Sequence, residues 1–576
     1  MESLRKSFRQ LTSITKVSLL ATSTVFIVAC NSSKTGNYEM ADTTVATEQD
    51  HRTVSSPTKI SRNKEKKDIS YNATQNADYA AGAVMDEAEM YISDDRVSQN
   101  TENYQKQIEN KFIQSLKEPL STFSIDVDNA SYSNARRFIQ SGQVPNPDAV
   151  RIEEFINYFD YDYKNPTGKH PFSVSTEIST APWNEKHKLV HVGIQGKDLD
   201  YDNLAPSNLV FLIDASGSMS AQNKLPLLRS SLKLLLSQLN ENDRIAIVAY
   251  AGAAGLVLES TPASESEKII NALDAVSSGG STAGGAGIQL AYSLAKDNLI
   301  KEGNNRVILC TDGDFNVGVN SPKELVKMIE TKRNDGIYLT VCGFGMGNYK
   351  DYQMEELSNA GNGNYFYIDN IQEAKKVFVK EMRATMFTIA KDVKIQIEFN
   401  PAKVAAYRLI GYENRMLEKE DFNDDKKDAG ELGAGHTVTA LYEIIPVGVK
   451  SEFFPSVDDL RYQKEENKIK ESYTAAASSD ELLNLKLRYK KPNEDTSNLI
   501  VNPLKDDNIK LDKTSDNFRF SAAVAEFGMI LRGSEYKSEA NYNQVMTLAK
   551  AAKGKDTEGY RAEFLKLVES CQLMSK

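Results

Sequence analysis

The stretch at residues 208–220 reads NLVFLIDASGSMS and decides the fold of the central part of the chain. Its apolar first half is typical of a strand that is buried on both faces of a parallel sheet. The apolar run stops at Asp214, and Ser216 and Ser218 follow on alternate positions of a turn. In open α/β sheets, ligands bind at the carboxyl ends of strands. One carboxylate and two hydroxyls at such an end suit a hard cation such as Mg²⁺ or Mn²⁺, because all three groups are oxygen donors.

Two later segments complete a pattern that begins with these residues. Thr282 lies in the glycine-rich segment 279–285, and Asp312 follows a second apolar run at 306–310. Together with the Asp-x-Ser-x-Ser turn, they resemble the metal-ion-dependent adhesion site of von Willebrand factor type A domains. The resemblance implies that residues 207–390 form such a domain, with an α/β fold built on a doubly wound, mostly parallel sheet. Strand-like and helix-like segments alternate over this range, which agrees with that fold class.

The same resemblance implies a ligand set for one divalent cation. Ser216, Ser218 and Thr282 would coordinate the ion directly, and Asp214 and Asp312 would bind it directly or through water. We expect Mg²⁺, with Mn²⁺ and Ca²⁺ as alternatives, because all three ions take oxygen ligands. With few carboxylates in contact, the ion stays electrophilic and can accept a carboxylate from a protein partner. The alternative is a degenerate site that keeps this shape and binds no ion.

Composition limits the classes of function. The chain has 576 residues, which predicts several domains. Its net charge of −11 and its isoelectric point near 5.3 argue against nucleic-acid binding, which needs a basic face. The four cysteines, Cys30, Cys310, Cys342 and Cys571, have no metal-binding spacing. We therefore expect neither a disulfide framework nor a cysteine-ligated metal.

The amino-terminal residues 1–30 are typical of an export signal. A basic start precedes a short apolar segment. This segment is shorter than the roughly 20 apolar residues that a transmembrane helix needs. The segment ends in Ala29-Cys30, which resembles a bacterial lipobox, so Cys30 is the expected site of lipidation. An ordinary signal peptide or a short membrane anchor is the alternative. We expect a lipoprotein of the bacterial cell envelope, at the outer membrane, and the sequence leaves open which face it occupies.

The remaining segments predict a tether and two blocks around the central domain. Residues 31–118 are polar and lack apolar periodicity, which favours a disordered tether. Residues 119–206 and 391–576 each contain a few strand-like segments, and the second block ends in a helical tail. Two segments of the first block resemble the module that precedes the type A domain in a family of bacterial lipoproteins. They read STFSIDVDNASYSNARRF and VRIEEFINYF. The tail resembles the carboxyl-terminal module of unknown function of the same family.

The two flanking blocks are expected to fold together. Each holds only three or four good strands, and a sheet of that size buries little apolar surface by itself. We therefore predict one composite β-rich module into which the type A domain is inserted. The closing helix of that domain, expected at residues 372–389, would lead directly into the first strand of the second block.

The sequence favours a binding protein over an enzyme. It contains no G-x-S-x-G, H-E-x-x-H or Walker pattern, and no histidine is near Ser216 or Ser218 in the sequence. The glycine-rich segment 343–347 is similar to a dinucleotide-binding fingerprint, but Asn348 stands where its last glycine is required, so no nucleotide is expected. We predict a non-enzymatic, metal-dependent protein-binding protein. The alternatives are an assembly or chaperone-like factor for envelope or secretion complexes, and a metal-dependent hydrolase.

Overall fold

The computed structural model describes residues 102–199, 205–280, 284–313, 322–347, 349–453 and 473–576. All of them belong to one compact unit that spans residues 94–576. The expected signal peptide, Cys30, Thr282 and residues 31–101 of the expected tether lie outside the described residues. In the described part of the chain, no helix combines the length and the apolar character needed to cross a bilayer.

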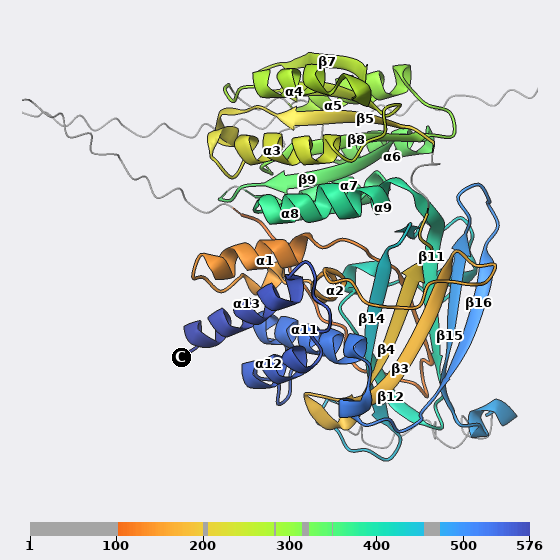
Figure 1. Ribbon diagram of the computed structural model, residues 1–576. Helices are drawn as coiled ribbons and strands as arrows, with labels where there is room; N and C mark the ends of the chain where they lie inside the picture. Colours follow the sequence, from red (N-terminus) through yellow and green to blue (C-terminus); the bar gives the residue numbers. More distant parts are fainter. Residues whose placement is uncertain (1–101, 200–204, 281–283, 314–321, 348, 454–472) are drawn as a thin grey trace, which may run out of the picture. The chain divides into compact units, whose positions relative to one another are not determined.

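A six-stranded sheet forms the centre of the middle part of the chain (Figure 1). Its strand order is β10-β9-β8-β5-β6-β7, and every neighbouring pair is parallel except β6 and β7. The strands are β5 (Ser207–Asp214), β6 (Arg244–Tyr250), β7 (Ala254–Pro262), β8 (Asn304–Thr311), β9 (Tyr338–Phe344) and β10 (Tyr365–Ile368). The predicted doubly wound, mostly parallel sheet is confirmed.

Helices cover both faces of this sheet, which explains why β5 is apolar throughout its middle. Leu209 and Phe211 pack into a core with α3 (Leu225–Leu236) and α4 (Ser266–Ala275). Val210 and Leu212 point to the other face and pack with α5 (Gly284–Asp297), α6 (Pro322–Asn334) and α7 (Asp351–Ala360). Because alternate residues serve opposite cores, no position in the run can be polar without being buried.

The closing helix of the sheet differs from the prediction of one helix over residues 372–389. It consists of α8 (Ile371–Lys375), a π-helical turn (Lys376–Glu381) and α9 (Met382–Met386), after which β11 begins at Thr388. The helix is shorter than predicted because Ile389 already packs into the core of the next module. The two ends of the inserted domain meet, since the Ser207 hydroxyl lies 3.7 Å from the sulfur of Met386.

Strands from both flanking blocks pair within two antiparallel sheets. The first sheet has the order β1-β12-β14-β4-β3, and the second has the order β13-β11-β15-β16, with β2 also paired to β11. The first block supplies β2 (Leu120–Ser124), β3 (Phe172–Ala181) and β4 (Asn184–Gly196), and β1 (Ile113–Gln114) precedes it. The second supplies β11 (Thr388–Phe399), β12 (Val404–Ile410), β13 (Gly430–Gly433), β14 (Thr437–Pro446), β15 (Glu481–Lys490) and β16 (Asn498–Lys505). The composite module predicted from the sequence is confirmed by these pairings.

The helices of the two blocks also share one core. Short helices of the first block, α1 (Ala130–Gln140) and α2 (Ile152–Asn157), pack with three helices of the tail. Those three are α11 (Asp516–Arg532), α12 (Tyr542–Ala551) and α13 (Tyr560–Met574). Aromatic rings from both flanking blocks meet in this core. For example, the ring centroids of Phe159 and Phe564 are 5.6 Å apart.

Residues 102–118 correct the predicted boundary of the tether, because they contact the folded unit. Glu102 forms an ion pair with Arg137 at 2.8 Å, and the amide nitrogen of Asn103 donates to the carbonyl oxygen of Tyr349 at 3.0 Å. Further along, β1 pairs with β12. Phe112 and Ile113 also make apolar contacts, but two adjacent residues are too few to give an apolar periodicity in the sequence.

The shared sheets predict that the second block does not fold by itself. Residues 384–576 expressed alone should show no cooperative thermal transition by circular dichroism, because β14 loses β4 and α11 loses α2. Coexpression with residues 102–206 should restore the transition. A cooperative transition of the isolated fragment would contradict this expectation.

Candidate functional site

The predicted ligands lie where the order of the central sheet reverses. From β5 the chain passes through α3 to β6, which pairs with one side of β5. From β7 it passes through α5 to β8, which pairs with the other side of β5. In open α/β sheets, ligands bind at such a switch point, at the carboxyl ends of the strands, here β5 and β8. Asp214 is the last residue of β5, and Asp312 directly follows Thr311 at the end of β8.

Asp214 is buried and is held by two hydrogen bonds. Its side chain is fully buried, and one carboxylate oxygen accepts a hydrogen bond from the Ser216 backbone N–H at 2.9 Å. The other accepts one from the Thr311 hydroxyl at 3.0 Å. Burial raises the pKa of Asp214 above its ordinary value, and the negative charge of Asp312 raises it further. A cation beside the two carboxylates would oppose both effects, so the electrostatics favour one there.

The serine hydroxyls converge above Asp214. The Oγ atoms of Ser216 and Ser218 lie 2.9 Å apart. Ser216 is buried, whereas Ser218 is exposed to solvent. Met219 directly follows Ser218 and is fully buried, so it anchors the turn in the core. The site therefore has a closed, acidic base and an open, hydroxyl-bearing side.

The glycine-rich segment packs directly against the Asp-x-Ser-x-Ser turn. The Gly217 backbone N–H donates to the carbonyl oxygen of Gly280 at 3.1 Å, and the Gly279 N–H donates to that of Ala215 at 2.8 Å. Gly280 adopts a positive φ of 86°, which glycine accommodates readily. The expected ligand Thr282 follows two residues later and lies outside the described residues.

Asp312 has a partner that the sequence did not reveal. The Lys224 ammonium group donates to its Oδ2 atom at 2.7 Å, and both side chains are buried. Lys224 precedes α3 in the polar segment Ser220-Ala-Gln-Asn-Lys224, which is typical of an exposed turn. No pattern in that segment distinguishes a buried lysine from the solvated lysines of ordinary turns.

The described donor set fits a hard divalent cation. Four of the five predicted ligands, Asp214, Ser216, Ser218 and Asp312, lie on adjoining strand ends and supply only oxygen atoms. Among the described residues, no three His, Cys, Asp or Glu side chains form a metal-binding group. The four described residues supply two carboxylates and two hydroxyls.

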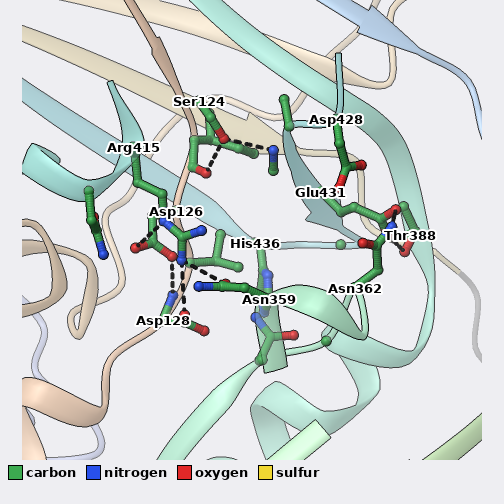
Figure 2. Close-up of a pocket in the computed structure, with 18 of the residues that line it drawn as sticks. Ser124, Asp126, Asp128, Asn359, Asn362, Thr388, Arg415, Asp428, Glu431 and His436 are labelled. Carbon is green, nitrogen blue, oxygen red and sulfur yellow. Dashed lines mark hydrogen bonds and ion pairs between the residues drawn. The ribbon is translucent and has the colours of Figure 1, made fainter. Parts of the chain in front are cut away.

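A separate polar pocket lies between the inserted domain and the composite module (Figure 2). Its volume is about 230 Å³, and its lining includes several carboxylates. Arg415 pairs with Asp126 at 3.1 Å and with Asp128 at 3.3 Å, while Glu431 accepts a hydrogen bond from Thr388 at 2.9 Å. These pairs lie within the composite module, and Arg415 also donates to the Asn359 side chain of the inserted domain at 2.9 Å.

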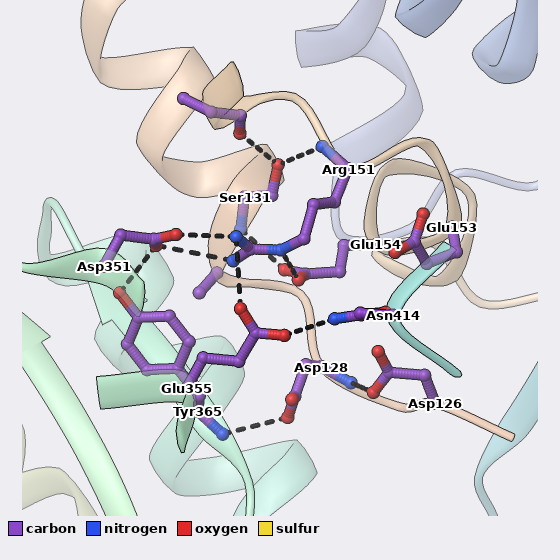
Figure 3. Close-up of polar contacts among 12 residues, drawn as sticks. Asp126, Asp128, Ser131, Arg151, Glu153, Glu154, Asp351, Glu355, Tyr365 and Asn414 are labelled. Carbon is purple, nitrogen blue, oxygen red and sulfur yellow. Dashed lines mark hydrogen bonds and ion pairs between the residues drawn. The ribbon is translucent and has the colours of Figure 1, made fainter. Parts of the chain in front are cut away.

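Next to this pocket, buried charges join the inserted domain to the first block (Figure 3). Arg151 pairs with Asp351 at 2.6 Å and with Glu355 at 3.4 Å, both on α7, and also with its neighbour Glu154. Glu153 is buried beside this cluster with neither carboxylate oxygen hydrogen-bonded. Burial raises the pKa of Glu153 to about 8 and that of Glu154 to about 7.

Three family models match the chain in order. They are "von Willebrand factor" at residues 98–191, "von Willebrand factor type A domain" at 208–380, and "Uncharacterized protein YfbK, C-terminal" at 384–574. The uncharacterized protein YfbK of Escherichia coli K12 is 47% identical over 476 residues, which cover 81% of this chain and 81% of that protein. The chain belongs to the YfbK family. YfbK-like proteins of this kind carry a type A domain between two flanking modules.

More distant proteins match parts of the chain. The uncharacterized protein sll0103 of Synechocystis is 28% identical over 200 residues, which cover 34% of this chain and 46% of that protein. A solved von Willebrand factor type A structure from Catenulispora acidiphila covers 70% of this chain and 91% of its own, at 15% identity and a TM-score of 0.36. The name of the YfbK relative assigns no activity to that protein.

The donor set predicts which hydroxyls govern metal affinity. Ser216→Ala and Ser218→Ala should each weaken Mn²⁺ binding by about tenfold or more, because a coordinating oxygen is removed. Isothermal titration calorimetry measures this directly. Ser220→Ala is the matched control, since it removes the same group from the same turn and should leave the affinity unchanged. Equal affinities in all three variants would contradict the ligand assignment.

The buried glutamates predict how stability depends on pH. The folded state binds more protons than the unfolded state between the ordinary pKa of 4.5 and the raised pKa of about 8 for Glu153. Stability should therefore fall as pH rises through this window and level off above it. The melting temperature of Glu153→Gln should fall less steeply than that of the wild type. Glu185→Gln, at an exposed position, is the control and should keep the wild-type slope; identical slopes in all three proteins would contradict the assignment.

Proposed function

We propose that this protein is a metal-dependent protein-binding protein that is anchored in a bacterial envelope by a lipid on Cys30. The observation that carries the binding role is the donor set at the ends of β5 and β8. Asp214 and Asp312 are buried there, while Ser218 is exposed. A cation held by this set is reached from solvent on the Ser218 side, where a group from a partner can join its ligand shell.

The chemistry of the donor set favours an acidic group of the partner. Hydroxyl ligands are neutral, so they leave more of the charge of the cation uncompensated than carboxylate ligands would. A carboxylate of a partner protein is a hard oxygen donor and carries the opposite charge. Type A domains mediate protein binding, and the central domain of this chain is one of them. The proposed partner is therefore a protein that presents an aspartate or glutamate side chain.

A hydrolytic role finds less support in the same residues. A metal-dependent hydrolase needs a group that takes a proton from the attacking water. Residues 207–386 contain no histidine. Both oxygens of Asp214 accept hydrogen bonds from the protein, and Asp312 pairs with Lys224. A binding role requires no such proton acceptor. The anchoring part of the proposal depends on the sequence of residues 1–30, which lie outside the described residues.

Capture of the partner tests the proposal. The full-length protein, tagged at its carboxyl terminus, should retain a protein partner from detergent extracts of its own envelope in Mg²⁺ and release it in EDTA. Ser218→Ala should fail to retain the partner, whereas Ser220→Ala should behave like the wild type. A partner that stays bound in EDTA, and that Ser218→Ala also retains, would contradict a metal-dependent interaction.

A further inference from the structure

A lysine is built into one side of the proposed metal site. Lys224 lies directly before α3, and its Nζ atom is 2.7 Å from Oδ2 of Asp312. The Lys224 side chain is 9% exposed and that of Asp312 is 0% exposed. The ammonium group thus places a positive charge in contact with one of the two acidic groups of the site.

The path of the lysine side chain is shaped by the segment between β9 and α7. Gly345 has a φ of 80°, and a Cβ atom placed on it would lie 2.6 Å from Cγ of Lys224. Any other residue at position 345 would collide with the lysine stem and would also be strained. The Tyr367 hydroxyl donates to the carbonyl oxygen of Gly345 and fixes this segment. Gly345, the middle glycine of the segment that is similar to a nucleotide-binding fingerprint, thus makes room for the Lys224 side chain.

The charges of the described side chains define what the lysine does. Asp214 and Asp312 carry two negative charges, Lys224 carries one positive charge, and the serines are neutral. These described side chains together therefore carry one net negative charge, which a divalent ion would change to one net positive charge. Without the lysine, the same ion would bring the described side chains only to neutrality. The lysine therefore disfavours the ion and favours an anion on the loaded site.

We propose that Lys224 is an internal cation of the metal site, which weakens divalent-ion binding and gives the loaded site the positive charge that attracts an anionic group of the partner. This inference rests on the proposed function and adds to it. It assigns the preference for an acidic partner to a residue that is not a metal ligand. The same ammonium group pairs with the buried carboxylate of Asp312 when no ion is bound. A buried carboxylate without such a partner would destabilise the folded state.

Two variants of the full-length protein test the role of the charge. Lys224→Met keeps the stem that packs on Gly345, and Lys224→Gln keeps a hydrogen-bond donor toward Asp312. Both remove the charge, so at least one should fold even if the other does not. In calorimetry, each folded variant should bind Mn²⁺ about tenfold more tightly than the wild type. Acetate, titrated into the Mn²⁺-loaded protein and followed by water proton relaxation, should bind about tenfold more weakly.

A matched control separates the local effect from the change in total charge. Lys233→Met removes an exposed lysine of α3 and should leave both affinities at the wild-type value. Unchanged or weakened Mn²⁺ binding in both folded Lys224 variants would overturn the inference while leaving the proposed function in place. If the wild type itself does not bind Mn²⁺, the proposed function fails first, and the two failures are thereby distinguished.

Discussion

The pairing of strands across the inserted domain is the constraint on which the rest of the structure depends. β4 ends just before the domain and pairs with β14, which lies well beyond it. β11 begins directly after the domain and pairs with β2. Both connections of the domain therefore lead into one module. The ion pairs of Arg151 with Asp351 and Glu355 add a third contact, which fixes α7 to the same module.

The parts of the fold that the sequence predicts are those with local signals. β5 is recognisable because both of its faces are buried, and Asp214, Ser216 and Ser218 follow it in a short, distinctive turn. Strands at sheet edges leave weaker signals in the sequence, because one side of such a strand is solvated. β16 alternates between partly buried and exposed residues and contains Pro503, which is tolerated because this strand is at an edge. β7 is likewise a largely exposed edge strand.

Lys224 shows why the site was predicted only in part. A metal ligand is recognised by its spacing from other ligands, but a buried counter-charge is recognised only by what surrounds it in space. The partner Asp312 lies 88 positions away, and the glycine that makes room for the lysine is in a third segment. Non-local contacts of this kind leave no periodicity or motif. The same holds for the ion pairs of residues 102–118, which the sequence predicts as part of the tether.

The contact between Ser207 and Met386 has a consequence for how the chain folds. Val190 pairs with Tyr442, which lies far along the chain. Bringing these two residues together closes a long loop, which has an entropic cost in an unfolded chain. The contacts of the inserted domain are closer in sequence, so it can fold before the flanking sheets form. Once it has folded, its two ends are already adjacent. If the inserted domain folds first, its adjacent ends would bring β4 and β11 close together and so reduce the entropic cost of pairing the two flanking blocks.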